Sequence, residues 1–150
     1  MKMETERLVI TSWHAANDDD LAALFEPEVV AALPPNYTGV TAPRAFLQDR
    51  EEEATLYGIW HLQRCIGLTF VFEDGTEGRI GYLLRKSAWG QGFGKEVVAA
   101  LVAHLKEGPM TTLYAGVEAD NIGSIKVLEY SGFKEIPSDQ EGLKSYRLTL

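Results

Sequence analysis

The sequence predicts a mixed α/β fold, with one central sheet, covering helices and a crossover connection in its second half. Two observations support this prediction. Between residues 55 and 85, three apolar and aromatic segments follow one another with short polar turns between them, which is typical of antiparallel hairpins. After residue 90, strand-like segments alternate with segments of helical periodicity, which is typical of strands joined through helices.

The first half of the chain contains two expected helices and four expected strands. Residues 7–13 alternate and include β-branched side chains, so they predict a first strand. A short helix over 17–25 begins at an Asn or Asp cap, and a second over 43–53 has a proline in its first turn. Between these helices, 33–39 is rich in Pro, Asn and Gly and predicts a loop. The three hairpin strands are expected over 56–62, 65–72 and 78–84.

The second half contains two further helices and three strands. Five aliphatic side chains at helical spacing predict a helix that follows a glycine-rich turn and ends at Gly108. Asp120 or Asn121 can cap the last helix, which Gly132 stops. Strands are expected over 112–117, 133–136 and 145–150, which makes about seven strands and about four helices in a single domain over residues 1–150.

Charge and composition exclude several classes of partner. The 150-residue chain has a net charge of −8, which repels nucleic acids and anionic membranes and suits a cationic acceptor. Its charged N-terminus and the lack of a long apolar run predict a cytoplasmic protein. The single cysteine, Cys65, lies in an apolar strand and is expected to pack in the core. The three histidines are scattered, so no metal site is expected.

The segment Trp89-Gly90-Gln91-Gly92-Phe93-Gly94-Lys95 is the first candidate site. It joins a strand to a helix, where unpaired N–H groups and the helix dipole attract anions. Its spacing fits neither a Rossmann turn nor a Walker loop. From the turn alone, a phosphate-binding loop and a tight turn without a ligand both stay open.

Two motifs resemble the GCN5-related N-acetyltransferases (GNAT), in the branch similar to the ribosomal-protein alanine N-acetyltransferases. The turn resembles the pyrophosphate-binding motif of that family, although Trp89 stands where many members have Gln or Arg. Asn121-x-x-Ser124, followed by Gly132-Phe133, resembles a helix of the same branch. The opening Glu4-Thr5-Glu6-Arg7-Leu8 and the strand ending Ile80-Gly81-Tyr82-Leu83-Leu84 also look like that branch, so the resemblance spans nearly the whole chain.

The resemblance implies acetyl-coenzyme A (acetyl-CoA) as cosubstrate, in a cleft between two parallel strands that splay apart. Backbone groups around Leu84 would pair with the pantetheine arm, Asn121 would hydrogen-bond it, and Ser124 would contact the coenzyme. The pyrophosphate would lie on the turn, on backbone groups of Gly90, Gln91, Gly92, Phe93, Gly94 and Lys95.

The implied reaction is transfer of an acetyl group to a primary amine, on a protein N-terminus or a small molecule, by direct attack in a ternary complex. Many relatives have a catalytic tyrosine where this chain has Leu128, so Ser124 is the candidate hydrogen-bond donor to the leaving thiolate. Glu77 is the candidate general base, with Glu118, His61 and a water chain as competitors.

Three rival functions stay open beside the acetyltransferase hypothesis. They are a CoA-binding or sensing module without turnover, an acyltransferase with another acyl donor, and transfer to a hydroxyl. The expected acceptor loops, 27–41 and 137–144, contain no recognisable specificity motif. Homodimers are common among similar proteins, and the sequence leaves a homodimer open.

Overall fold

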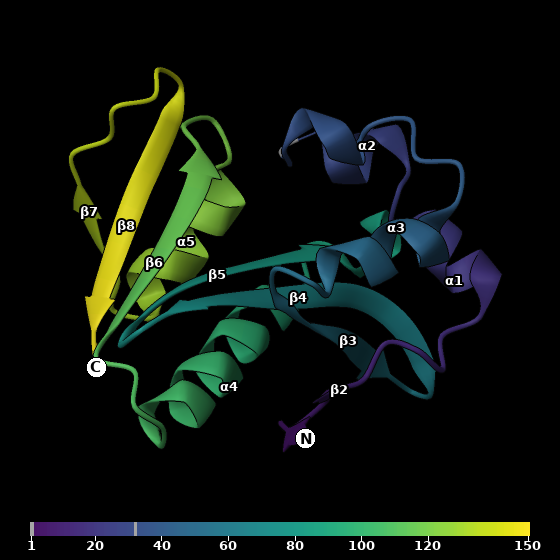
Figure 1. Cartoon of the computed structure of the whole chain (residues 1–150), viewed down its shortest axis with the longest axis horizontal. Coiled ribbons are helices and arrows are strands. Elements are labelled where there is room, and N and C mark those ends of the chain that lie inside the picture. Colours follow the sequence, from purple (N-terminus) through teal and green to yellow (C-terminus); the bar gives the residue numbers. More distant parts are fainter. Residues whose placement is uncertain (1, 32) are drawn as a thin grey trace.

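The computed structural model describes residues 2–31 and 33–150, and they form a mixed sheet with helices on both faces (Figure 1). Within these residues the strands are β1 (Met3–Glu4), β2 (Val9–Thr11), β3 (Thr55–His61), β4 (Arg64–Asp74), β5 (Glu77–Leu84), β6 (Thr112–Glu118), β7 (Lys134–Ile136) and β8 (Leu143–Thr149). The helices are α1 (Asp18–Ala23), α2 (Pro27–Val30), α3 (Pro43–Arg50), α4 (Phe93–Lys106) and α5 (Ile122–Tyr130), with two 3₁₀ turns, η1 (Pro35–Tyr37) and η2 (Lys86–Ala88).

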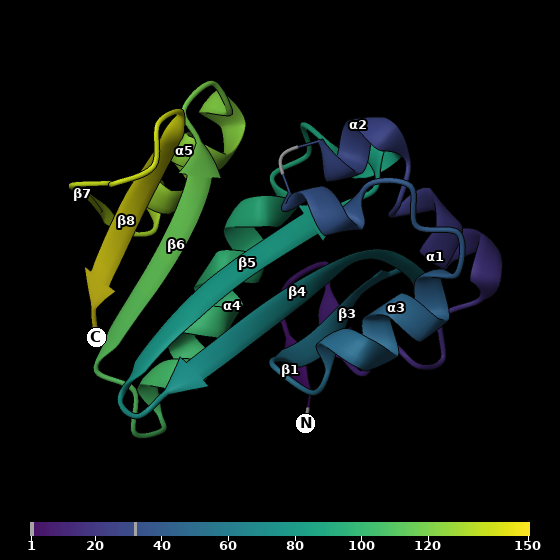
Figure 2. The same ribbon diagram turned by 45° about the horizontal axis from the view of Figure 1, so that its top comes forward.

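The strands lie in the order β1-β2-β3-β4-β5-β6-β8-β7, and only β5 and β6 are parallel neighbours. The connection between these two strands is α4, so the predicted crossover is confirmed. β4 and β5 pair without interruption from Asp74–Glu77 to Gly67–Leu84. By contrast, β5 and β6 pair only from Glu77–Thr112 to Arg79–Tyr114 and then diverge (Figure 2).

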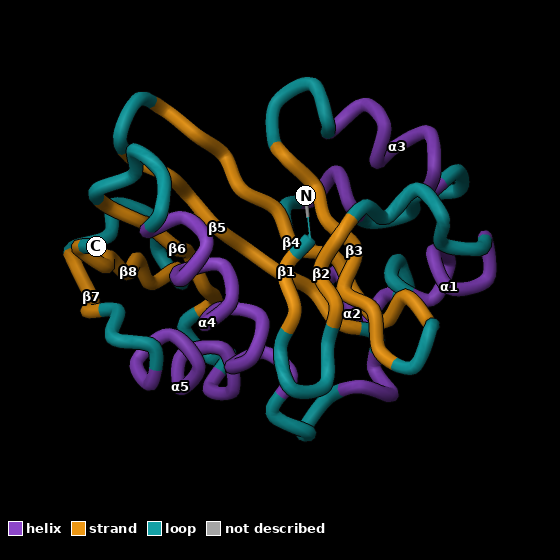
Figure 3. The backbone as a smooth tube through the Cα atoms, turned by 90° about the horizontal axis from the view of Figure 1, so that it is seen from below, coloured by secondary structure: helices purple, strands orange, loops and turns teal. Residues whose placement is uncertain are grey.

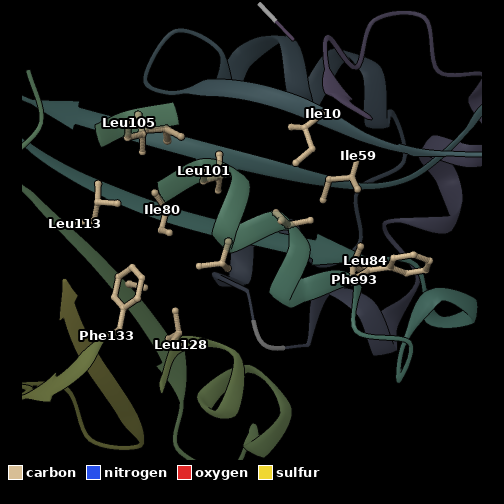
Figure 4. Close-up of a cluster of buried hydrophobic side chains, with 14 of the residues drawn as sticks. Ile10, Ile59, Ile80, Leu84, Phe93, Leu101, Leu105, Leu113, Leu128 and Phe133 are labelled. Atoms are coloured by element: carbon tan, nitrogen blue, oxygen red, sulfur yellow. The ribbon is translucent and has the colours of Figure 1, made fainter. Parts of the chain in front are cut away.

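Two buried clusters hold the layers together. On one face, α4 and α5 pack on the sheet around Leu101, Leu113 and Leu128, as the tube view and the close-up show (Figures 3 and 4). On the other face, α1, α2 and α3 pack around Trp13, Leu24 and Leu68. Burial of this apolar surface is the main stabilising contribution to folding.

The structure corrects several expected boundaries. The first expected strand, 7–13, shortens to β2, and an added edge strand, β1, pairs with it to give eight strands instead of seven. Part of the expected acceptor loop 27–41 forms the short helix α2 and the turn η1. Cys65 is fully buried, and burial raises the pKa of its thiol to about 11.

Candidate functional site

The glycine turn leads into the N-terminus of the longest helix. Gly92 is the residue before α4 and has a φ of 81°, a left-handed conformation that glycine adopts without the steric penalty of a side chain. Gly90 has a φ of 73°. The first N–H groups of the 14-residue helix therefore point out of the turn beside the positive end of the helix dipole. This arrangement suits an anionic group such as a pyrophosphate.

Side chains from the N-terminal segment and from β3 contact the first turn of α4. Thr5 Oγ1 donates to Glu96 Oε2 (2.7 Å), and Arg7 forms an ion pair with the same carboxylate in the first turn of α4. Burial raises the pKa of Glu96, but the hydrogen bonds from Thr5 and Arg7 outweigh it and hold that pKa below its ordinary value. The Phe93 side chain is buried against His61 and the Arg7 guanidinium, so only its backbone faces a ligand in the turn.

The end of β5 directs backbone groups toward the side where β5 and β6 no longer pair. The Arg85 N–H donates to the Ile66 carbonyl (2.8 Å), so these two residues form a hydrogen-bonded pair. The next pair, Leu84 and Gly67, is then a non-hydrogen-bonded pair, and the N–H and C=O groups of Leu84 point away from β4. Because this pattern alternates along the strand, the backbone groups of Tyr82 point the same way. The ladder to β6 has ended at Arg79, so this edge of β5 is open to an extended ligand.

Trp89, the departure from the usual motif, ties the turn to this strand end. Its indole Nε1 donates to the Leu84 carbonyl (2.8 Å), while nearly half of the residue's surface is exposed. The Leu84 N–H and the Tyr82 backbone groups keep their orientation toward the open edge of β5. The Gln91 side chain donates back to the Ser87 carbonyl (2.9 Å), which closes the loop after η2.

The first turn of α5 places its two candidate residues together. Asn121 caps the helix, because its Oδ1 accepts from the Ser124 N–H (3.2 Å). Ser124 Oγ lies 3.4 Å from the Tyr82 hydroxyl of β5. Burial raises the pKa of the Tyr82 phenol, which keeps it protonated at neutral pH. Sequence reasoning missed Tyr82 as a site residue. The available signal was an aromatic side chain two residues before Leu84, on the same face of the strand.

Glu77 lies apart from this group. Seven positions along β5 separate it from Leu84, which is roughly 23 Å in an extended strand. Its carboxylate accepts from the Tyr114 hydroxyl (2.8 Å) and lines a hollow of about 390 Å³, together with Glu73 and Asp74. The assignment of Glu77 as general base stays a prediction.

The competing bases and Lys95 lie in different surroundings. Glu118 is the last residue of β6. The His61 ring packs on Phe93, and its Nδ1 lies 3.2 Å from the Arg7 carbonyl. The Lys95 ammonium lies 4.3 Å from the centre of the exposed Tyr130 ring. In the described part of the chain, no group of His, Cys, Asp or Glu side chains is arranged to hold a metal ion.

Comparison with known proteins identifies the family of this chain. The model of the acetyltransferase (GNAT) domain matches residues 7–134, which include the turn, strands β5 and β6 and the last helix. The chain belongs to the GNAT acetyltransferase family. No curated protein sequence matches it.

Solved GNAT structures have the same fold. An acetyltransferase of the GNAT family from Bacillus anthracis superposes with a TM-score of 0.80 at 18% identity, over 99% of this chain and 98% of that one. The ribosomal L7/L12 α-N-protein acetyltransferase RimL, solved with CoA, gives 0.75 at 19% identity, over 100% and 98%. An acetyltransferase from Salmonella typhimurium that modifies the N-terminal serine of ribosomal protein L7/L12 gives 0.75 at 16% identity, over 100% and 99%.

No helix of the described residues has both the length and the apolar character that a bilayer crossing requires.

Proposed function

We propose that this GNAT protein transfers an acetyl group from acetyl-CoA to a primary amine by direct attack in a ternary complex. The observation that carries the proposal is the continuous path from the open edge of β5 to the glycine turn at the start of α4. The open edge offers backbone groups to an extended amide-containing chain, and the turn offers N–H groups to a pyrophosphate. CoA contains both in the same order, so the residues present fit the cosubstrate.

Each candidate residue has a separate task in this proposal. Gly90, Gln91, Gly92, Phe93, Gly94 and Lys95 hold the pyrophosphate through their backbone, and the helix dipole adds to that attraction. Leu84 and Tyr82 pair with the pantetheine arm through backbone groups. The Asn121 Oδ1 is engaged in the helix cap, so its NH₂ group is the part that donates to the cosubstrate.

Acetyl-CoA supplies an activated acyl carbon that bonds to the amine nitrogen as its bond to sulfur breaks. A backbone N–H of β5 donates to the carbonyl oxygen while negative charge develops on it. Ser124 donates a hydrogen bond to the sulfur that receives the electron pair, and the solvent protonates that thiolate. The amine proton passes to a base or to water. Since Glu77 lies far along β5, water at the Leu84 end is the nearer acceptor.

The acceptor class follows from charge and from the relatives. A protein with a net charge of −8 attracts a cationic amine. RimL and the Salmonella protein act on the N-terminus of a ribosomal protein, which makes a peptide N-terminus the first acceptor class to test. Helix α2 lies beside the end of β5, because Glu28 forms an ion pair with Lys86, two residues after that strand, so α2 is the first element to test for contact with the acceptor.

A thiol-release assay with acetyl-CoA tests the proposal. The acceptors would be peptides with free N-terminal Ala or Ser, a polyamine and, as controls, the N-blocked peptides and a small alcohol. We expect thiol release and an added acetyl mass on at least one free amine. Binding of CoA without transfer to any acceptor would favour a sensing module. Transfer only from longer acyl-CoAs would favour a different acyl donor, and transfer only to the alcohol would favour a hydroxyl acceptor.

A further inference from the structure

A tyrosine from β5 contacts the candidate serine of α5. The Tyr82 hydroxyl lies 3.4 Å from Ser124 Oγ, and the two residues are 42 positions apart in the chain. The ring lies beneath the first turn of α4 and is mostly buried there. The hydroxyl therefore reaches the point where β5, α4 and α5 come together.

The last glycine of the turn leaves room for this hydroxyl. A Cβ atom on Gly94 would lie 2.8 Å from Tyr82 Oη, closer than Cβ atoms come to other heavy atoms, and 3.2 Å from its Cζ, which is a tight contact. Any larger residue at position 94 would have to displace the ring. Gly94 and Tyr82 are thus fitted to one another, and the phenol is held in one place by packing as well as by its hydrogen bond.

The neighbourhood of Ser124 explains what the phenol can do. The next core-facing residues of α5, Ile125 and Leu128, are apolar and buried, so they offer no hydrogen bond to the serine hydroxyl. A serine O–H rotates to any available acceptor, including a carbonyl of its own helix. A phenol that donates to Ser124 Oγ occupies one lone pair and leaves the serine hydrogen free to point elsewhere.

We infer that Tyr82 is a positioning residue, whose O–H donates to Ser124 Oγ and directs the Ser124 hydrogen toward the sulfur that leaves acetyl-CoA. The inference rests on the proposed function. Tyr82 keeps its proton throughout, and the serine hydrogen bond stabilises the thiolate as the carbon–sulfur bond breaks. The role differs from that of a general acid, since no proton leaves the phenol.

Tyr82→Phe is the direct test, because it removes the hydroxyl and keeps the ring packed against Gly94. We expect kcat to fall roughly three- to tenfold, as for the loss of one hydrogen bond, with the KM for acetyl-CoA unchanged. Tyr57→Phe is the matched control, since Tyr57 is a partly buried tyrosine on β3, two strands away in the same row of the sheet. A change in the KM for acetyl-CoA with kcat unchanged, or no change in either constant, would overturn the inference.

A double-mutant cycle tests whether Tyr82 acts through Ser124. In the Ser124→Ala background, Tyr82→Phe should lower kcat no further, because the hydroxyl that it orients is gone. Equal losses in both backgrounds would show that Tyr82 acts independently and would overturn the inference. Thermal unfolding of all four proteins checks that the variants are folded.

An acceptor-free measurement separates this inference from the proposed function. The thiolate absorbance of bound CoA, taken as a difference from the complex with desulfo-CoA, gives the pKa of the bound thiol. We expect that pKa to be higher in Tyr82→Phe than in wild type, and unchanged in Tyr57→Phe. Wild-type protein that binds no CoA would overturn both proposals. An equal thiol pKa in wild type and Tyr82→Phe would overturn only the role of Tyr82.

Discussion

The two ends of β5 differ in what they offer to a ligand. At the N-terminal end, Glu77 to Arg79 pair with β6, and the polar side chains face an exposed hollow. At the C-terminal end β6 has diverged while β4 still pairs, and this open edge of β5 lies near the glycine turn and the Tyr82–Ser124 pair. A cosubstrate that is bound through its amides and phosphates needs the second arrangement. In the proposed function, binding would therefore be determined mainly by backbone geometry, with few side chains required.

The largest expected effect comes from introducing a side chain into the glycine turn that follows the C-terminal end of β5. Gly92→Val would strain the left-handed turn and misplace the N–H groups proposed to hold the phosphates, so we expect acetyl-CoA affinity to fall about a hundredfold or more. Gly75→Val is the matched control at the other end of β5, because Gly75 also has a positive φ and open space around it. Calorimetry should show normal affinity for Gly75→Val, and equal losses in both variants would remove the distinction between the two ends.

The next largest effect concerns a cluster of charged residues, Asp20, Arg64 and Arg85, next to the C-terminal end of β5. Asp20 is buried, and it accepts from Arg64 (2.5 Å) and from Arg85 (3.3 Å), the residue after β5. The Arg64 hydrogen bond, assisted by the charges of Arg64 and Arg85, outweighs desolvation and lowers the pKa of Asp20. A carboxyl whose pKa is lower in the folded than in the unfolded chain stabilises the fold at any pH above its unfolded pKa. That stabilisation is lost as the pH falls through the folded pKa.

Asp20→Asn should therefore lower the free energy of unfolding at pH 7 by about 1.5–3 kcal/mol. The difference from wild type should begin to shrink below about pH 4, where Asp20 becomes protonated in the unfolded chain. It should be gone once the pH has also fallen below the lowered pKa of the folded state. Asp18→Asn is the control, because its ion pair with Arg44 is exposed and is expected to matter by less than about 1 kcal/mol. Urea titrations at several pH values measure both, and a difference that persists at low pH would contradict the role of the charge.

A smaller effect isolates the bond between the turn and the strand. Trp89→Phe removes the indole N–H that holds the Leu84 carbonyl, and we expect roughly three- to tenfold weaker acetyl-CoA binding. Trp60→Phe removes a similar bond, from its indole to the Ser12 carbonyl (3.1 Å), away from the turn. Unchanged affinity for Trp89→Phe, or the same loss in both variants, would show that this bond does not position the site.

The smallest effect is expected at the N-terminal end of β5. Glu77→Gln should lower kcat/KM by no more than about threefold and leave the acidic limb of its pH profile in place, because Glu77 lies too far from Leu84 for direct proton transfer. Steady-state kinetics across the pH range measures this. If kcat/KM instead fell about a hundredfold and the acidic limb of the pH profile disappeared, Glu77 would be established as the base.

Local sequence patterns predicted most of the fold. The aliphatic spacing of Val97, Leu101 and Leu105 predicted α4. Helix α5 begins after Asn121 and ends before Gly132, as expected. The three hairpin strands were also predicted, although the positive φ values of the first turn fall on Leu62 and Gln63. The added strand β1 has only two residues, too few for a period to be visible, and its existence depends on pairing with β2.

The site was less predictable because its contacts join distant segments. The position of the glycine turn followed from sequence, but the bonds from Thr5 and Arg7 to Glu96 span about ninety residues and have no local signal. The Tyr82–Ser124 contact likewise depends on how β5 and α5 are packed. The sequence places Glu77 next to the start of an expected strand, 78–84, but only the register with β6 shows that it lies at the paired end, away from the open edge.

The central claim is that the C-terminal end of β5 and the glycine turn hold acetyl-CoA. Calorimetric titration of the wild-type protein with acetyl-CoA, and separately with NAD and ATP, tests it most directly. We predict saturable one-site binding of acetyl-CoA alone, and its loss in Gly92→Val. Absence of binding to the wild-type protein, or full affinity in Gly92→Val, would contradict the claim.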